Sequence, residues 1–260
     1  GLFLTLAIVL ERVWEKPYAE IIALWTLGAA MIGLGAPLAG WLADRFSQAR
    51  MMAVFFLGLG ASAIGAGLVA DASGMAMALA ALGIFGAIYH PVGMAWVSMT
   101  APADRRGRIM GVLGIAGSIG VALAAVIAGG LAELGGWRLA MILPGAVTVL
   151  AGLLLMATIF LGKIDIGAAV GGAKTGHKAD GASELRAPFA VLAVLTVTFT
   201  LGAIAYAAYT TALPKWLSDS LALDANEAGS LGLVVGAIML SGSIGQVIGG
   251  RLADRLPFKW

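Results

Sequence analysis

The stretch GWLADRF at residues 40–46 is repeated as GRLADRL at residues 250–256. Each copy closes a long apolar segment. With the chain overlaid on itself at an offset of 210 residues, Gly35, Gly40, Leu42, Ala43, Asp44 and Arg45 fall on Gly245, Gly250, Leu252, Ala253, Asp254 and Arg255. A match at the same place in two apolar segments indicates a duplicated helical unit rather than coincidence in a chain rich in Gly, Ala and Leu.

The composition is that of a polytopic membrane protein. Of the 260 residues, 60% are hydrophobic and 12% are charged, whereas a soluble domain carries about 25% charged residues. The mean hydropathy is +0.97. Apolar runs such as 51–70 and 109–132 reach the roughly 20 residues that a membrane-spanning helix needs, and they are too long and continuous for barrel strands. The 38 glycines suit close helix packing in a membrane, and the lack of cysteine excludes disulfides and thiolate sites.

Eight hydrophobic segments follow one another along the chain. They are a partial Gly1–Leu10, then Tyr18–Ala43, Met51–Ala70, Met75–Met99, Arg108–Ala132, Arg138–Leu161, Pro188–Leu213 and Glu227–Ala253. The polar, Gly/Ala-rich stretch 163–187 is typical of a flexible linker. We therefore expect an N-terminal helical bundle over 1–162, the linker, and the start of a second bundle over 188–260. Both ends look cut, so we expect a fragment of a longer protein.

Lysine and arginine fall unequally on the two faces that alternating segments define. One face collects Arg45, Arg50, Arg105, Arg106, Arg108, Lys163, Lys174, Lys178, Arg186, Arg251, Arg255 and Lys259. The other face has only Arg12, Lys16, Arg138 and Lys215. The positive-inside rule predicts that the first face, with both Leu-Ala-Asp-Arg copies, the 4–5 loop and the linker, is cytoplasmic.

The stretch GWLADRFSQARMM, residues 40–52, resembles the loop between helices two and three of the major facilitator superfamily. The second copy resembles the same loop of that family's C-terminal half. Residues 83–111, which contain His90-Pro91, and YTTALPKWL at 209–217 are similar to helices four and seven of fosmidomycin-resistance-type drug efflux members. The resemblance implies an all-α fold of two six-helix bundles, here incomplete, with about eight transmembrane helices from the end of helix one to helix eight. Ser47 stands where a glycine is common, so we expect a less tight turn there.

The resemblance also implies a gating role for the repeated loop. Asp44 would be the anion of a latch between the two halves in the outward-facing state, with Arg45 and either Arg50 or Arg108 as its cations. A carboxylate at a helix end is favoured near the N-terminus of a neighbouring helix. The family loop and its second copy give these candidate residues: Gly40, Asp44, Arg45, Arg50, Arg108, Gly250, Asp254 and Arg255. The alternative is that the arginines only set the topology.

His90 is the sharpest candidate inside the membrane. It lies about 22 Å along a helix that starts at Met75, and it shares a face with Gly83, Gly86 and Gly93. A glycine face packs against protein, so His90 is predicted to point at protein or a cavity. An ionisable residue there indicates function, either proton coupling or substrate binding. The alternative is a structural histidine that satisfies a group freed by Pro91.

Other candidates concern substrate contact and helix packing. Tyr206, Tyr209 and Thr210 near the end of the seventh segment are predicted to line the cavity and contact substrate, although threonine also bonds to its own helix and tyrosine suits the membrane interface. The fifth segment is similar to the glycine-rich helix of facilitator antiporters. Small residues predicted to pack helices together are Gly83, Gly86, Gly93, Gly111, Gly114 and Gly117. Glu11, Arg12, Glu133 and Arg138 look like charges of outer loops.

These patterns favour a secondary active transporter over an enzyme. No Walker motif, metal cluster or nucleophile–base set is present in the sequence. We expect proton-coupled efflux of a small organic solute by alternating access, driven by the proton gradient without a cofactor or metal. The expected setting is the bacterial inner membrane, as a monomer, with lipid and a small-molecule substrate but no nucleic acid as partners. The alternatives are an uptake carrier for a sugar, organic acid or inorganic anion, and a non-transporting sensor or scaffold on the same fold.

Overall fold

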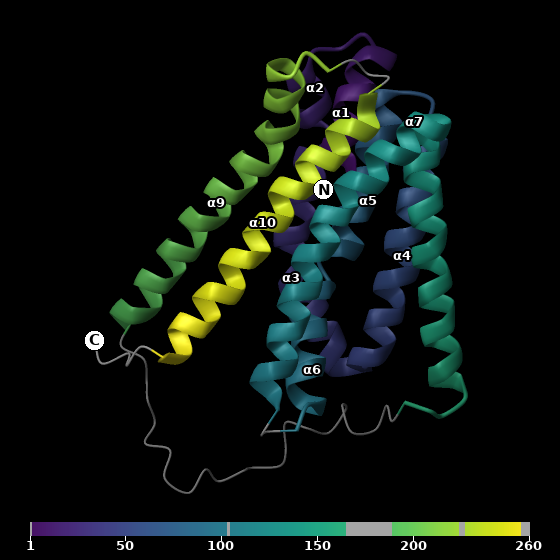
Figure 1. Cartoon of the computed structure of the whole chain (residues 1–260). Coiled ribbons are helices and arrows are strands. Elements are labelled where there is room, and N and C mark those ends of the chain that lie inside the picture. The colour runs from purple at the N-terminus through teal and green to yellow at the C-terminus, as the bar shows by residue number, and fades with distance from the viewer. Residues whose placement is uncertain (1, 103–104, 165–188, 224–226, 256–260) are drawn as a thin grey trace, which may run out of the picture.

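The computed structural model describes residues 2–102, 105–164, 189–223 and 227–255, and these form helices joined by short turns without a strand. The helices run back and forth between two ends of the molecule (Figure 1). In chain order they are α1 Leu2–Val13, α2 Tyr18–Ala23, α3 Trp25–Phe46, α4 Gln48–Leu68, α5 Ala72–Gly86, the π-helix η1 Tyr89–Gly93, α6 Met94–Thr100, α7 Arg106–Phe160, α9 Phe189–Ser220 and α10 Ala228–Arg255.

Within the described residues, five helical stretches are long and apolar enough to cross a membrane. Large apolar side chains such as Leu34, Phe160 and Phe189 are exposed on the outside of the bundle. Such a surface would be costly in water but is suited to lipid, where close packing rather than hydrophobic burial holds helices together. The all-α membrane fold expected from the sequence is confirmed.

Two of the predicted segments contain breaks that hydropathy does not reveal. The segment predicted over 18–43 is divided into α2 and α3 at Leu24. The segment predicted over 75–99 consists of α5, η1 and α6, because Pro91 has no N–H to donate and a wide turn forms around it.

The helix α7 contains two membrane crossings that reverse direction at a pair of glycines. Gly135 has φ −150° and ψ 18°, and Gly136 has φ 78° and ψ 172°, a backbone conformation that glycine adopts without steric cost. The first limb, residues 106–134, and the second limb, residues 137–160, correspond to the two segments predicted from hydropathy. The connection is short, with only these two glycines outside helical geometry (Figure 1).

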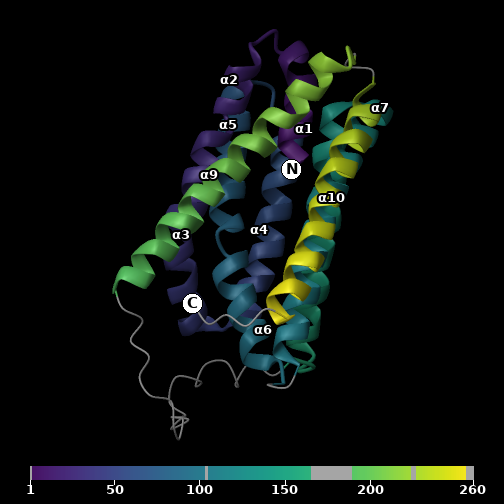
Figure 2. The same cartoon turned by 60° about the vertical axis from the view of Figure 1, so that its left-hand side comes forward.

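The helices after the linker meet those before it through α7 and α1. Along much of its length α10 lies beside the first limb of α7 (Figure 2). A core of Ile8, Ala125, Leu213, Leu217, Leu231 and Val235 joins α1, α7, α9 and α10. In contrast, the 18-residue apolar part of α9 that qualifies it as a membrane-spanning helix contains no buried residue. The start of α9 stands apart from the other helices (Figure 1).

The two ends of the bundle are named here by a residue that each contains. The Asp44 end, at the bottom of Figure 1, holds the α3–α4 turn, the end of α6 and the end of α10. The Glu11 end, at the top, holds the α1–α2 turn, the α4–α5 turn, the reversal of α7 and the end of α9. Both Leu-Ala-Asp-Arg helices therefore finish at the same end. The division into bundles at 162 and 188 stays a prediction, and residues 165–187 of the linker lie outside the described residues.

Candidate functional site

A small cavity of about 270 Å³ lies where α7, α9 and α10 come together. Its lining residues are Ser118 and Val121 of α7, Tyr206 and Tyr209 of α9, and Ile238, Met239, Ser241 and Gly242 of α10. On each helix the lining residues are spaced three or four apart or next to each other, so they share one face. The structure thus brings two of the predicted substrate residues into one cavity with two serines that the sequence analysis did not single out.

The polar groups of this cavity differ in how much of their hydrogen-bonding capacity is free. The phenol hydroxyls of Tyr206 and Tyr209 form no hydrogen bond within the described residues, and both side chains are exposed to the cavity or its mouth. Ser241 donates to the carbonyl of Ile238 at 2.7 Å, and Ser118 donates to the carbonyl of Gly114 at 3.2 Å. The tyrosine hydroxyls therefore keep both donor and acceptor free, whereas the serine hydroxyls keep only acceptor capacity.

Thr210 lies outside this cavity. Its hydroxyl donates to the carbonyls of Tyr206 and Ala207, at 2.9 and 3.2 Å. Such back-bonding within a helix satisfies the hydroxyl locally. The structure thus separates Thr210 from the two tyrosines with which it was grouped.

The turn between α3 and α4 at the Asp44 end is tighter than the sequence predicted. Ser47 is its one residue, is fully buried, and has φ 131°. Its hydroxyl accepts a hydrogen bond from the N–H of Arg50 at 3.3 Å and so caps α4. The expectation that a serine would loosen this turn is wrong, because the side chain supplies a cap that glycine lacks.

The predicted latch residues of this turn are not paired with one another. Asp44 forms no hydrogen bond or ion pair within the described residues, and Asp44, Arg45, Arg50 and Arg108 are all exposed. The guanidinium of Arg45 lies 5.8 Å from the ring centre of Trp41, and a Cβ at Gly40 would be 4.0 Å from Pro91. Gly250, Asp254 and Arg255 lie in the last turns of α10, where the side chains are outside the described part. The latch role stays a prediction.

His90 lies in η1, with an exposed side chain that meets the ring of Tyr89 edge-on at 5.2 Å. The neighbouring Val92 is buried instead. On the same helical segment, a Cβ at Gly83 would clash with the backbone of Gly28. Helical spacing predicted that His90 points at protein or a cavity. Its side chain is exposed rather than buried among the described residues, and its position in a cavity stays a prediction.

The glycines of α7 divide into an open group and a packed group. A Cβ at Gly111, Gly114 or Gly117 would have no atom of the described residues within 4 Å, so the packing predicted for them is absent here. Packing occurs instead further along the limb, where a Cβ at Gly129 would clash with the backbone of Ala228. On α10, Gly232 and Gly236 lie against the carbonyls of Ala125 and Ala122 in the same way.

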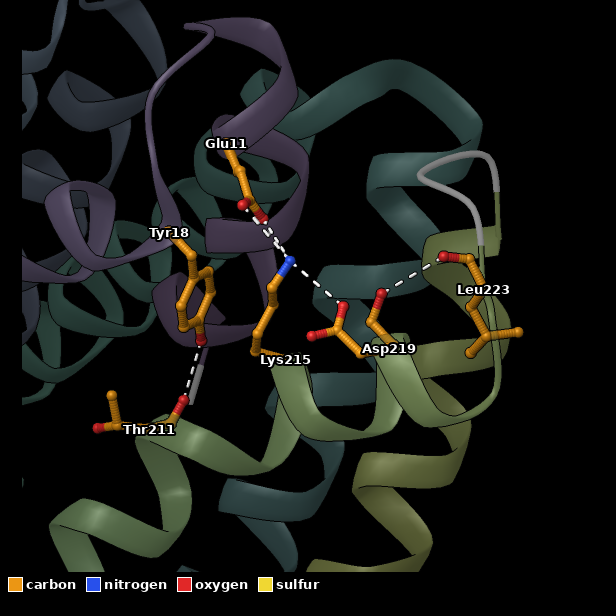
Figure 3. Close-up of polar contacts among 7 residues, drawn as sticks. Glu11, Tyr18, Thr211, Lys215, Asp219 and Leu223 are labelled. Carbon is orange, nitrogen blue, oxygen red and sulfur yellow. Dashed lines mark hydrogen bonds and ion pairs between the residues drawn. The ribbon is translucent and has the colours of Figure 1, made fainter.

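At the Glu11 end, polar contacts join helices that precede the linker to helices that follow it (Figure 3). The ammonium of Lys215 lies 3.0 Å from Oε2 of Glu11 and 3.3 Å from Oδ1 of Asp219. The hydroxyl of Tyr18 donates to the carbonyl of Thr211 at 2.9 Å. Glu11, Lys215 and Asp219 border a second cavity of about 510 Å³, whose other lining residues are Ile8, Arg12, Ser218, Ala222 and Leu223.

A third cross-contact caps α10. The carboxylate of Glu133 accepts from the N–H of Gly229 at 3.0 Å, where the first turn of a helix has unsatisfied donors and a positive dipole end. Glu133 was read from the sequence as an outer-loop charge, and so was Arg138. Arg138 donates instead to the carbonyls of Gly67 and Val69, at 3.0 and 2.7 Å, and so satisfies the end of α4.

Apolar helices that cross back and forth form the architecture of a polytopic membrane protein. The chain belongs to the Major Facilitator Superfamily, whose family model matches residues 3–260. This is a family of membrane transporters and not of enzymes, as the sequence analysis expected.

Two proteins similar to this chain are named for resistance to drugs. The chain is 30% identical over 131 residues to a puromycin resistance protein of Streptomyces alboniger, a match that covers 49% of this chain and 26% of that protein. It is 29% identical over 141 residues to a multidrug resistance protein B homolog of Mycobacterium tuberculosis, covering 52% of this chain and 26% of the relative. The matched part thus spans about a quarter of each relative's length.

Proposed function

We propose that this chain belongs to a secondary transporter that exports a small organic compound in exchange for protons. The cavity between α7, α9 and α10 carries the proposal, because it lies where helices on both sides of the linker meet. In transporters built from repeated bundles, the substrate site lies between the repeats. The resistance roles of the two relatives support export of a drug-like compound.

The chemistry of the cavity favours an uncharged or weakly polar substrate with an aromatic part. Within the described residues the lining contains no charged side chain. Two phenol rings offer stacking surfaces and hydroxyls, and Val121, Ile238 and Met239 supply apolar contacts. Methionine adapts to differently shaped ligands, which suits a transporter of several compounds.

The contrast between the two ends supports alternating access. At the Glu11 end, ion-pair and hydrogen-bond contacts join the helices. At the Asp44 end, Asp44 is unpaired in the described residues and the glycines of α7 are open. One closed end and one open end are what a single state of such a cycle requires. A closed latch at Asp44 would belong to the opposite state.

The proton is proposed to pass through His90. The imidazole is exposed on a helix of the membrane region and is one of only two histidines in the chain. Histidine is the side chain whose ordinary pKa allows it to gain and lose a proton near neutral pH. Replacement His90→Gln should leave substrate exchange in place but remove its stimulation by a pH gradient. Unchanged stimulation would rule His90 out as the proton carrier.

The test of the substrate site is transport by the complete protein in vesicles with an imposed pH gradient and a panel of aromatic drugs. Tyr206→Phe and Tyr209→Phe should each raise the apparent KM about three- to tenfold, the effect of one lost hydrogen bond. Thr200→Val is the matched control, since its hydroxyl donates to Thr196 on the same helix and does not line the cavity. Transport of a sugar or inorganic anion in place of the drugs would favour an uptake carrier, and no transport of any compound would favour a sensor.

A further inference from the structure

Lys215 has two carboxylate partners, and they belong to different parts of the molecule. Glu11 is on α1, before the linker, whereas Asp219 is one turn further along α9 on the same helix as Lys215 (Figure 3). The side chains of Lys215, Glu11 and Asp219 are 33%, 25% and 63% exposed. The ion pair with Glu11 is thus the more sheltered, and the pair with Asp219 faces the solvent of the cavity.

The two ion pairs respond differently to a separation of α1 from α9. The pair with Glu11 must break, because its partners move apart with their helices. The pair with Asp219 persists, because residues four apart on a helix stay neighbours. Lys215 therefore keeps a carboxylate partner in both arrangements and is never left as an isolated cation facing low-dielectric surroundings.

The two carboxylates have opposite effects on the closed arrangement. Glu11 attracts Lys215 across the boundary and holds the end shut. Asp219 competes for the same ammonium and repels Glu11, since two like charges are brought to one cation. Removing Asp219 therefore strengthens the contact that closes this end, and removing Glu11 abolishes it.

We propose that Lys215 is the gate cation of the Glu11 end, shared by Glu11 and Asp219 when this end is closed and held by Asp219 alone when it opens. Tyr18 and Glu133 reinforce the closed arrangement through Thr211 and the first turn of α10. The inference rests on the alternating access proposed above and assigns its gate at the end opposite to Asp44.

The test measures distances across both ends of the complete protein in liposomes. These 260 residues contain no cysteine, and any cysteine elsewhere in the complete protein is first changed to serine, so that spin labels can be placed at chosen sites. The exposed Val13 and Ser220, each changed to Cys, report on the Glu11 end. The exposed Phe46 and Phe189, changed likewise, report on the Asp44 end. Pulsed dipolar spectroscopy then gives the open and closed populations at each end.

The expected result is a pair of opposite shifts. Glu11→Gln should raise the ratio of open to closed molecules at the Glu11 end about three- to fivefold, the size expected of a half-exposed ion pair. Asp219→Asn should lower the same ratio by a similar factor. Glu20→Gln is the matched control, because its ion pair with Lys16 at 3.0 Å is also spaced four apart but does not connect α1 to α9; it should leave the ratio unchanged.

The outcomes separate the gate from the transport cycle. If Glu11→Gln and Asp219→Asn shift the ratio in the same direction, or neither shifts it, the exchange at Lys215 is wrong, even where the two ends still open in turn. If the two variants act oppositely at the Glu11 end while the Asp44 end stays fixed, the gate stands and alternating access is wrong. Opposite shifts with reciprocal changes at the Asp44 end support both.

Discussion

Ser47 makes the turn at the Asp44 end in a backbone conformation that side chains rarely adopt. With φ 131° and ψ 149° it occupies a region that is nearly restricted to glycine. Its hydroxyl compensates by capping α4 through the N–H of Arg50. Because the backbone strain and the cap both involve Ser47, two different substitutions at this position can separate their effects on stability.

We predict opposite effects of two small replacements at this position. Ser47→Ala removes the cap and retains the strain, so it should destabilise the folded protein by about 1 kcal/mol. Ser47→Gly removes the backbone strain, which costs about 1–3 kcal/mol in a residue with a side chain. The lost cap costs only about a few tenths of a kcal/mol when glycine replaces serine. Glycine should therefore raise the midpoint of thermal unfolding in detergent, whereas alanine should lower it. Equal midpoints for the two variants would contradict the strain.

Asp71 starts α5 and gives a prediction about pH. Its carboxylate accepts from the N–H of Gly74 at 2.8 Å and from the hydroxyl of Ser73 at 2.7 Å. These hydrogen bonds, that of Gly74 first, hold the pKa of Asp71 below its usual value. A lowered pKa in the folded state means that the contribution to stability is complete above the ordinary pKa and is lost as the pH falls through the folded one.

Protection of the Gly74 amide from hydrogen exchange should therefore decrease in acid, after correction for the intrinsic rate. Asp71→Asn is the control, since an asparagine can cap the same N–H but does not titrate in this range. Its protection should be constant over the same pH values. An equal decrease in the variant would show that another group is responsible.

Single residues also show what a sequence cannot predict. Tyr206 and Tyr209 could be picked out because phenols are few in so apolar a chain and are spaced on one helical face. Ser118 could not, since a serine in a glycine-rich helix carries no distinctive pattern. The pairing of Glu11 with Lys215 was beyond reach for another reason: the two are 204 residues apart, and helical periodicity gives the face of a residue but not its partner.

At the scale of elements, the contact between α7 and α10 depends on small residues at a few positions. Gly129 faces the backbone of Ala228 directly, whereas a Cβ at the adjacent Gly130 would have no described atom within 4 Å. Close approach of two membrane helices needs small residues at the contact and tolerates large ones elsewhere. Two neighbouring glycines thus differ in the size of side chain that each position can accept.

Gly129→Leu and Gly130→Leu should therefore have different effects on stability and transport. The first forces α10 away from α7 and should lower the thermal unfolding midpoint and reduce transport, because overpacking of a close contact costs about 1–3 kcal/mol or more. The second places its side chain toward open space and should leave both near those of the parent protein. The comparison can be made by unfolding in detergent and by transport in vesicles. Equal loss in both variants would contradict the packing described here.

The length and order of the helices follow from hydropathy, but their interruptions do not. A run of apolar residues long enough to cross a bilayer was sufficient to predict the segments at 51–70 and 138–161, which match α4 and the second limb of α7. The break at Leu24 and the wide turn at Pro91 change the hydrogen bonding without changing the polarity. The exposure of His90, on a segment whose Gly83 packs against Gly28, likewise could not be derived from its spacing.

At the scale of the whole molecule, the charges predict which end faces the cytoplasm. The Asp44 end carries Arg45, Arg50 and Arg108, and the Glu11 end carries Arg12 and Lys215. The positive-inside rule predicts that the first end faces the cytoplasm. The structure adds that the helix ends carrying these five residues lie at opposite ends of the described helices (Figure 1).

Labelling of single cysteines in intact cells can test this orientation. A membrane-impermeant maleimide should react with Ser220→Cys from outside, and with Phe46→Cys only after the cells are made permeable. The same protein without an introduced cysteine gives the background, since these 260 residues contain none. The reverse pattern would overturn the orientation and, with it, the expected cytoplasmic position of the Asp44 turn.

The reversal of α7 at Gly135 and Gly136 has a consequence for biosynthesis. Two crossings joined by only two non-helical residues leave no length of chain that would let the first settle in the bilayer while the second waits in water. Hydrocarbon accepts a backbone only where its polar groups are already bonded within a helix. We therefore expect residues 106–160 to leave the insertion machinery together, as one helical hairpin, with the glycine pair as its leading tip.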